Sequence, residues 1–200
     1  MRRSVVGRGA YALARVAVIV RASAGWLWWL GVLAAGIGVL LPGLTGRRIG
    51  VLAGAALFLI AAVVVFMARR KRYLTLARGA SRAGKSVFLQ DRAVTVRTRR
   101  RAVRWWLLLA FLAAVGSSFA VPAAGGMLMA GLGVGLWAKA LWLGRWERAN
   151  DVLLWVRPEW VPRGRPAGKA VNGYQTTGIV AGDAGPGGAR RARAMESAAR

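Results

Sequence analysis

Four long apolar stretches, separated by segments rich in arginine, dominate the pattern of the chain. They run from Ala22 to Leu41, from Ile49 to Met67, from Trp105 to Val121 and from Ala123 to Leu143, and Lys139 is their one ionisable residue. An α-helix needs roughly 20 apolar residues to cross the hydrocarbon core of a bilayer. Because these stretches are apolar on every side, they lack the one-sided pattern of soluble helices. The pattern therefore predicts an all-α membrane protein.

The polar segments divide the chain and predict its orientation. Pro42 and Pro122 lie in the two short connections, so the four predicted transmembrane helices form two hairpins. The expected parts are a basic lead-in (1–21), a first hairpin (22–67), a basic connector (68–104), a second hairpin (105–143), an interfacial segment (144–161) and a disordered basic tail (162–200). Loops rich in Lys and Arg stay on the cytoplasmic side of a membrane. We therefore expect a multi-pass protein of the cell (inner or plasma) membrane with both termini cytoplasmic.

The charge balance and the missing residue types narrow the possible chemistry. The chain has 31 Lys and Arg residues against 6 Asp and Glu residues, a formal net charge of +25. Such an excess favours polyanionic partners, either nucleic acid or anionic lipid headgroups. Because the chain has no Cys and no His, thiol nucleophiles, zinc clusters and imidazole acid–base chemistry are excluded. We expect no catalytic residues, no metal site and no cofactor, and the sequence identifies no small-molecule substrate.

The connector is the expected working surface. It holds thirteen Lys and Arg residues against one acid, Asp91, which is more positive charge than topology alone requires. The candidate DNA-binding residues are its two clustered ends, Arg69, Arg70, Lys71, Arg72, Arg97, Arg99, Arg100, Arg101 and Arg104. Binding without sequence preference would follow from counterion release at the phosphates. The alternative, equally open, is that these charges only set topology and hold the connector on anionic lipid.

Tryptophan supports the predicted orientation. Clusters of tryptophan begin the first and third predicted spans and end the fourth, as in the aromatic belt at a membrane interface. Beyond the last span we expect a short interfacial helix over 145–156. Trp155 and Trp160 lie past the spans and are the better candidates for stacking on nucleic-acid bases.

Residues 79–86 match the phosphate-loop pattern G-x-x-x-x-G-K-[ST] through Gly79, Gly84, Lys85 and Ser86. In that motif a strand precedes the loop and a helix follows it, so Tyr73 to Ala77 would form the strand and Val87 to Leu89 would open the helix. The connector is too short to hold the rest of the sheet that such a domain needs. We therefore expect no enzyme. Phosphate affinity without catalysis stays open as a second interpretation.

Small residues lie at helical spacing inside two of the spans. Gly50 and Gly54 are four apart in the second span, and Gly131 and Gly135 are four apart in the fourth. This spacing lets helix backbones approach closely in lipid. Packing within one bundle is one interpretation, and a homo-oligomer through one of these two faces is the other. Lys139 lies near the end of the fourth span, from where its ammonium group can reach the interface.

The same architecture resembles the small "spread" membrane proteins encoded on conjugative plasmids of mycelial actinobacteria. The resemblance lies in the basic lead-in, the four spans with turns at Pro42 and Pro122, the connector from Arg69 to Arg104 and the basic tail. It implies an oligomeric membrane assembly that contacts double-stranded DNA and passes plasmid DNA between cell compartments. No site residue carries over, because no diagnostic motif is shared. The alternative function is a structural or pore-forming, holin-like subunit, whereas the lack of carboxylates inside the spans disfavours a transporter accessory.

Overall fold

The computed structural model describes residues 12–84, 88–90, 92–161 and 165–179. Its helices are α1 (Val16–Ala22), α2 (Ala24–Leu40), α3 (Arg47–Met67), α4 (Arg70–Arg78), α5 (Arg92–Ser117) and α6 (Ala124–Ala149). Its strands are β1 (Ala12–Arg15), β2 (Ser81–Arg82), β3 (Phe88–Leu89), β4 (Val152–Val156) and β5 (Gln175–Gly178), and a 3₁₀ turn, η1, covers Pro158–Trp160. The fold is mostly helical, as the sequence predicts, but it also contains a small sheet.

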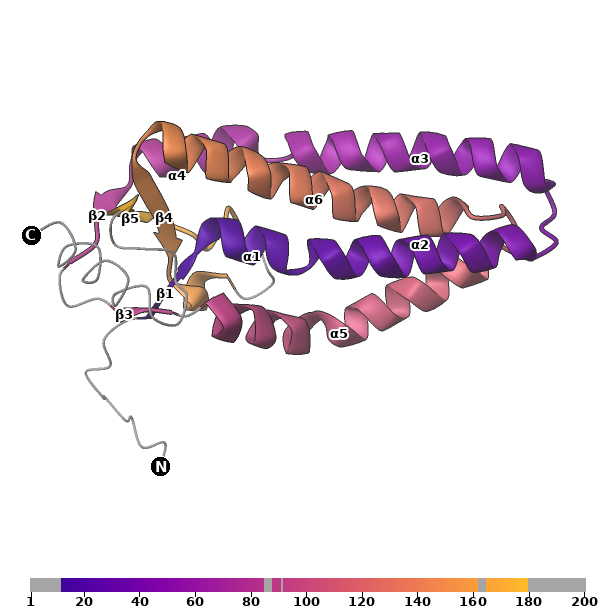
Figure 1. The fold of residues 1–200 in the computed structure, drawn as a ribbon, viewed down its shortest axis with the longest axis horizontal. Coiled ribbons are helices and arrows are strands. Elements are labelled where there is room, and N and C mark those ends of the chain that lie inside the picture. Colours follow the sequence, from indigo (N-terminus) through magenta and orange to yellow (C-terminus); the bar gives the residue numbers. More distant parts are fainter. Residues whose placement is uncertain (1–11, 85–87, 91, 162–164, 180–200) are drawn as a thin grey trace, which may run out of the picture.

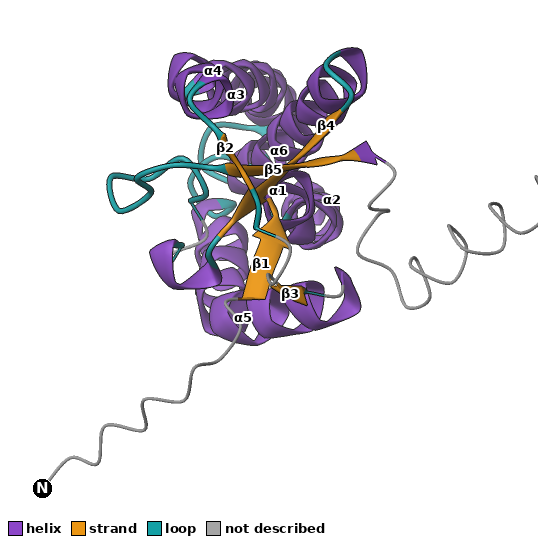
Figure 2. Cartoon of the chain, turned by 90° about the vertical axis from the view of Figure 1, so that its left-hand side faces the viewer, coloured by secondary structure: helices purple, strands orange, loops and turns teal. Residues whose placement is uncertain are grey.

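The long helices run side by side along the longest dimension of the molecule (Figure 1). At one end, named the turn end here, the connection 41–46 meets residues 118–123. There the amide of Leu44 donates a hydrogen bond of 3.1 Å to the carbonyl of Phe119. At the opposite end, named the sheet end, lie the strands and α4, and Figure 2 looks onto this end. The sheet end therefore gathers the segments that join the long helices to the strands.

Among the described residues, three helical segments are long and apolar enough to cross a membrane: Val16–Leu40, Arg47–Arg78 and Ala124–Ala149. The first consists of α1 and α2 with Ser23 between them, and the second of α3 and α4. The expected fourth span is not among them. α5 begins inside the basic connector and ends at Ser117, so its apolar part is shorter than an ordinary bilayer crossing. The length and apolar composition of these three helices thus indicate a membrane protein.

The outer surface of the bundle is apolar along these helices. In α3, Leu52, Leu59 and Val63 point outward and are each more than half exposed, and in α2 Leu33 does the same. A soluble bundle would present polar side chains at such positions. Outward apolar side chains on helices whose backbone groups are satisfied internally are typical of a protein surrounded by lipid.

α6 lies between α2 and α3, and its glycines make that position possible (Figure 1). A Cβ atom added at Gly131 would overlap the backbone of Phe58 in α3, and one added at Gly133 would overlap the backbone of Trp28 in α2. Gly135 also lies against α3. Helix backbones this close gain extensive van der Waals contact, a main source of helix association in lipid.

Both glycine pairs singled out in the sequence are used inside the chain. Gly131 and Gly135 face α3, while Gly50 and Gly54 of α3 face residues 122–127. The interpretation as packing within one bundle therefore describes their contacts. The chain's own residues lie against both glycine pairs, and the homo-oligomer stays a prediction.

Lys139 is buried, with 5% of its surface exposed, and so does not reach out to the interface as the sequence suggests. Its Nζ donates a hydrogen bond of 2.8 Å to the carbonyl of Ala68, the residue after α3. It also lies 5.7 Å from the centre of the Tyr73 ring. Arg69, with a φ of 60°, turns the chain there from α3 into α4. A cation beside the last carbonyl groups of a helix stabilises that end, so Lys139 fixes the joint between α3 and α4 against α6.

The strands of the described residues form one sheet in the order β2-β5-β4-β1-β3 (Figure 2). β4 pairs antiparallel with both β1 and β5, with Ala14 opposite Val156 and Leu154 opposite Thr176. The aliphatic and aromatic side chains of β4 favour a strand, and Leu154 and Trp155 are fully buried. The all-α prediction is wrong here, because strands this short leave no alternating pattern and find their partners far away in the sequence.

The segments beside two of the predicted spans also differ from expectation. α6 continues to Ala149, and β4 follows once Asp151, with a φ of 52°, has turned the chain. The interfacial helix predicted over 145–156 is therefore half helix and half strand. On the other side, residues 12–22, most of which belong to the predicted basic lead-in, form β1 and α1, and Val16 of α1 is completely buried.

Residues 165–179 have a defined structure, although the sequence predicts disorder from residue 162 onward. β5 lies here, and Ala167 and Tyr174 are buried in the core of the sheet end. A few apolar side chains suffice because the bundle supplies the rest of that core, and the sparse apolar content of the segment does not reveal this contribution. Residues 162–164 and 180–200 of the predicted tail lie outside the described residues.

A buried ion pair connects the strands with the bundle. Arg15, at the end of β1, donates to Glu147 of α6, with 2.6 Å between Nη2 and Oε2, and the Glu147 side chain is 1% exposed. Its other oxygen, Oε1, accepts a hydrogen bond of 3.0 Å from the amide of Leu154 in β4. A carboxylate is tolerated inside a protein when its charge and its oxygens are matched in this way. Glu147 thus joins β1, α6 and β4 at one point.

We expect Glu147→Gln to lower the free energy of unfolding by about 3–5 kcal/mol, because it removes the buried charge that balances Arg15. Thermal unfolding of the purified protein in detergent measures the change. Glu159→Gln removes an exposed carboxylate and should stay within about 0.5 kcal/mol of the parent protein. Equal losses in the two variants would contradict a special role for Glu147.

Gly131→Ala should lower the melting temperature, whereas Gly144→Ala in the same helix should not. A Cβ atom at Gly131 meets the backbone of Phe58, but one at Gly144 meets nothing within 4 Å, and alanine favours an open helical position by about 1 kcal/mol. Size-exclusion chromatography of both variants tests the oligomer interpretation. A changed oligomeric state of Gly131→Ala with an unchanged melting temperature would contradict packing inside the chain.

Candidate polyanion-binding site

α5 begins as a strongly basic helix. Its arginines are Arg92, Arg97, Arg99, Arg100, Arg101 and Arg104, and all of them except Arg99 are exposed. The first turn contains no acidic residue, so within the described helix no carboxylate offsets the repulsion between these cations and the positive end of the helix dipole; Asp91, which precedes the helix, lies outside the described residues. The start of α5 is therefore a surface at which bound anions are favoured.

A cleft of about 760 Å³ lies between this part of α5, the α1–α2 segment and the second half of α6. Arginines from four elements line it, namely Arg15 from β1, Arg21 from α1, Arg92 and Arg100 from α5 and Arg148 from α6. Trp26, Trp29 and Trp137 line it as well. This arginine cleft brings together basic residues from the lead-in, the connector and the segment after the last predicted span.

The arginine cleft is strongly positive, because four of its five arginines have no carboxylate partner in the described part of the chain. Arg15 is paired with Glu147. The Nε of Arg148 donates to a carbonyl of its own helix, and the guanidinium of Arg100 lies 5.6 Å from the centre of the Trp26 ring. Guanidinium groups bind phosphate oxygens through paired, charge-assisted hydrogen bonds. The described lining residues offer binding groups rather than a general acid or base.

The cluster from Arg69 to Arg72 has a different role. Nη1 of Arg69 donates 3.2 Å to the carbonyl of Ala167, and Nη2 of Arg72 donates 3.0 Å to the carbonyl of Gly168. The guanidinium of Arg70 lies between aromatic rings of α3 and α6, and Lys71 is exposed. Two of these four cations therefore hold the segment 165–171 in place.

The structure does not bring the two predicted arginine clusters together. In the end-on view, α4 lies on one side of the bundle and α5 on the opposite side, with α1, α6 and the sheet between them (Figure 2). The connector thus does not form one continuous basic surface. Its α5 end contributes to the arginine cleft, while its α4 end binds backbone carbonyl groups of the chain itself.

The remaining predicted arginines of α5 have separate environments. Arg97 and Arg101 are exposed and do not line the arginine cleft. Nη1 of Arg99 donates 3.4 Å to the carbonyl of Val161, and burial lowers the pKa of its guanidinium, which still stays protonated at neutral pH. The guanidinium of Arg104 lies 5.5 Å from the centre of the Trp105 ring. Of this predicted cluster, only Arg100 lines the arginine cleft.

The phosphate-loop match has the wrong neighbours. The residues before it form helix α4, which ends at Arg78 with Gly79 as its C-cap, and Phe88–Leu89 after it form strand β3. The predicted strand over 73–77 and the predicted helix start after the loop are therefore both wrong, and the order is opposite to the strand–loop–helix of that motif. Lys85 and Ser86 lie outside the described residues, and Gly84 lies in a loop.

Trp155 is fully buried in β4, and its Nε1 donates 2.8 Å to the hydroxyl of Thr177. Stacking of Trp155 on a base is therefore excluded. Trp160 packs against the core of the sheet end, with the guanidinium of Arg157 5.1 Å from its ring centre. The tryptophans that face a basic cleft are instead those of the predicted aromatic belt.

Sequence reasoning missed the contributions of Arg15, Arg21, Arg92, Arg148 and Glu147. A signal for Glu147 exists, because it continues the four-residue spacing of Gly131, Gly135, Lys139 and Leu143 along one side of α6. This side faces the interior, as the burial of Lys139 and Glu147 shows. For the arginines, only the tertiary arrangement shows that they meet.

Comparisons with protein-family models, with curated proteins and with solved structures gave no match. No residue role can therefore be carried over from a relative. The interpretation of the arginine cleft rests on its geometry, its charge and the chemistry of its side chains.

Arg69→Gln/Arg72→Gln should loosen residues 165–179, because both side chains bind carbonyl groups of that segment. Loss of these charged donors is expected to speed amide exchange there by roughly tenfold. Hydrogen–deuterium exchange with mass spectrometry measures this. The charge-matched control is Lys71→Gln/Arg78→Gln, which changes two exposed residues. Unchanged exchange in the first variant would contradict the structural role.

Proposed function

We propose that the protein is a multi-pass membrane protein that binds DNA at its sheet end and takes part in passing plasmid DNA between cell compartments. The arginine cleft carries this proposal, since five arginines from four elements converge there beside three tryptophans. Arginine binds the phosphate oxygens of duplex and single-stranded DNA alike, and tryptophan stacks on bases where a strand is unpaired. Neither contact reads base edges by hydrogen bonds, so binding would be independent of sequence.

In the proposed orientation the sheet end faces the cytoplasm. The basic segments at the start of α1, around α4 and at the start of α5 lie at this end (Figure 1). The turn end carries Arg47 and Arg48. Cytoplasmic loops carry the excess of Lys and Arg in membrane proteins, which supports this orientation. The arginine cleft then faces the compartment in which DNA is present.

We also propose that α5 provides a fourth span. Its apolar part, from Trp105 to Ser117, rises about 20 Å at roughly 1.5 Å per residue. Trp105, Trp106 and Leu112 are each more than half exposed on the outside of the bundle, which supports contact with lipid. A short span is accommodated by local thinning of the bilayer and by flanking cations that reach its surface.

The test of DNA binding is a salt titration of the detergent-purified full chain with duplex DNA, compared with Arg21→Gln/Arg148→Gln. Both substituted residues line the arginine cleft. Loss of two phosphate contacts should lower the slope of log K against log salt by about 2 and weaken binding at low salt. Fluorescence anisotropy of a labelled duplex measures both quantities.

The matched control is Arg78→Gln/Arg82→Gln, which removes two exposed charges from α4 and β2 without touching the cleft. Its salt slope should change by less than that of the cleft variant. Equal effects would mean that net charge, rather than the cleft, binds DNA. No binding by the parent protein near physiological salt would overturn the DNA proposal and favour the structural or pore-forming alternative.

A further inference from the structure

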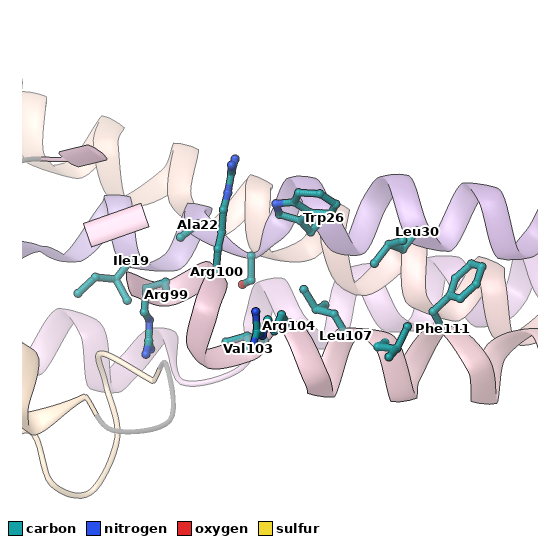
Figure 3. Close-up of a pocket in the computed structure, with 12 residues that line it drawn as sticks. Ile19, Ala22, Trp26, Leu30, Arg99, Arg100, Val103, Arg104, Leu107 and Phe111 are labelled. Carbon is teal, nitrogen blue, oxygen red and sulfur yellow. The ribbon is translucent and has the colours of Figure 1, made fainter. Parts of the chain in front are cut away.

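A second cleft, of about 330 Å³, lies between the α1–α2 segment and α5 (Figure 3). Trp26 and Leu30 line its α2 wall, and Leu107 and Phe111 line its α5 wall. Its volume falls within the range of about 300–1,000 Å³ that is usual for small-molecule sites. It is named the apolar cleft here.

The lining of the apolar cleft changes character along its length. Leu30, Leu107 and Phe111 lie toward the turn end, and Arg100 and Arg104 lie toward the sheet end (Figure 3). The change follows from the sequence of α5, because residues three and four apart share one side of a helix. The cleft is therefore amphipathic, with a cationic end and an apolar end.

The protein does not neutralise the cationic end. In the described part of the chain, neither Arg100 nor Arg104 forms an ion pair with a carboxylate. Their nearest aromatic neighbours are Trp26 and Trp105, at 5.6 Å and 5.5 Å from the ring centres. Arg99 also lines the cleft but turns its guanidinium away, toward the carbonyl of Val161 (Figure 3). Arg100 and Arg104 thus both bring positive charge to this end of the cleft, although their side chains extend in different directions (Figure 3).

In the proposed orientation, the cationic end of the apolar cleft lies at the boundary of the bilayer. Trp26 and Trp105 flank the arginines, and tryptophan prefers the headgroup level of a membrane. When α2 spans the membrane, the arginines lie at the level of the phosphates and the leucines lie in the hydrocarbon. An occupant must therefore have an anionic group at one end and an apolar chain at the other.

We propose that the apolar cleft binds one anionic phospholipid, with its phosphate at the cationic end that Arg100 and Arg104 line. One acyl chain lies along Leu30, Leu107 and Phe111. Free phosphate and a nucleic-acid backbone have no part that matches this apolar wall, and a zwitterionic lipid lacks the net charge that the two arginines select. The proposal rests on the membrane insertion proposed above and does not depend on DNA binding.

The test is native mass spectrometry of the detergent-purified full chain with phosphatidylglycerol or phosphatidylcholine of identical acyl chains. The parent protein should retain phosphatidylglycerol in preference to phosphatidylcholine. Arg100→Gln/Arg104→Gln should lose at least about tenfold of that preference, because two charge-assisted hydrogen bonds disappear. Arg97→Gln/Arg101→Gln, with the same charge change on exposed positions outside the cleft, should keep it.

A second variant tests the acyl-chain part without changing charge. Val103→Trp fills the cleft from its α5 wall and should reduce retention of phosphatidylglycerol. Millimolar inorganic phosphate should not displace the lipid from the parent protein. Displacement of the lipid by phosphate would overturn the proposed acyl-chain contact and would mean that the cleft binds simple anions. Equal losses in the two arginine variants, or equal retention of both lipids by the parent, would overturn the proposal. Thermal unfolding in lipid-free detergent verifies that each variant is folded.

Different variants test the DNA proposal and the lipid proposal, so one can be overturned without the other. Arg21 and Arg148 line the arginine cleft and not the apolar cleft. Unchanged phosphatidylglycerol retention by Arg21→Gln/Arg148→Gln supports a lipid site that does not use these two arginines. A loss of retention in that variant as large as in Arg100→Gln/Arg104→Gln would overturn it.

Discussion

The carboxylate of Glu147 is the point on which the arrangement of the sheet end depends. One of its oxygens pairs with the guanidinium of Arg15, and the other accepts a hydrogen bond from the amide of Leu154. It therefore determines where β1 and β4 meet the end of α6. Arg15 directly precedes α1, and its position therefore sets how α1 lies against α6. These two helices form walls of the arginine cleft. A single buried acid in a chain of extreme positive charge thus organises the surface on which the cations are displayed.

The helical part of the fold could be predicted because its cause is local. A stretch such as Ile49 to Met67 is apolar on every side, and length and composition alone identify it as a helix able to cross a membrane. The sheet has no local cause of that kind. Strand β1 pairs with residues as distant as Val156, and β2 and β3 contain two residues each. Such strands exist only because the bundle places their edges side by side.

The sequence predicts that the candidate site is rich in arginine, but it does not predict which arginines lie together. The sequence identifies the arginines of the connector as an excess over what topology needs, yet it cannot show which of them meet a partner. Arg69 and Arg72 bind carbonyl groups of 165–171, a segment that composition assigns to disorder. Arg21 and Arg148 lie outside the connector but share a cleft with Arg100. Which cations remain available is decided by tertiary contacts, and periodicity carries no information about these.

Arg100 and Trp26 line both clefts, so the two proposed ligands would meet at one guanidinium group. When Arg100 binds a lipid phosphate, it is no longer available to a DNA phosphate. Bound lipid therefore lowers the affinity of the protein for DNA. By linkage, bound DNA must weaken lipid binding by the same factor. The coupling is limited, because Arg21, Arg92 and Arg148 line only the arginine cleft and keep their charge when lipid is bound. Anionic lipid would therefore reduce DNA affinity and its salt dependence without abolishing binding, so that DNA held at the membrane surface stays exchangeable.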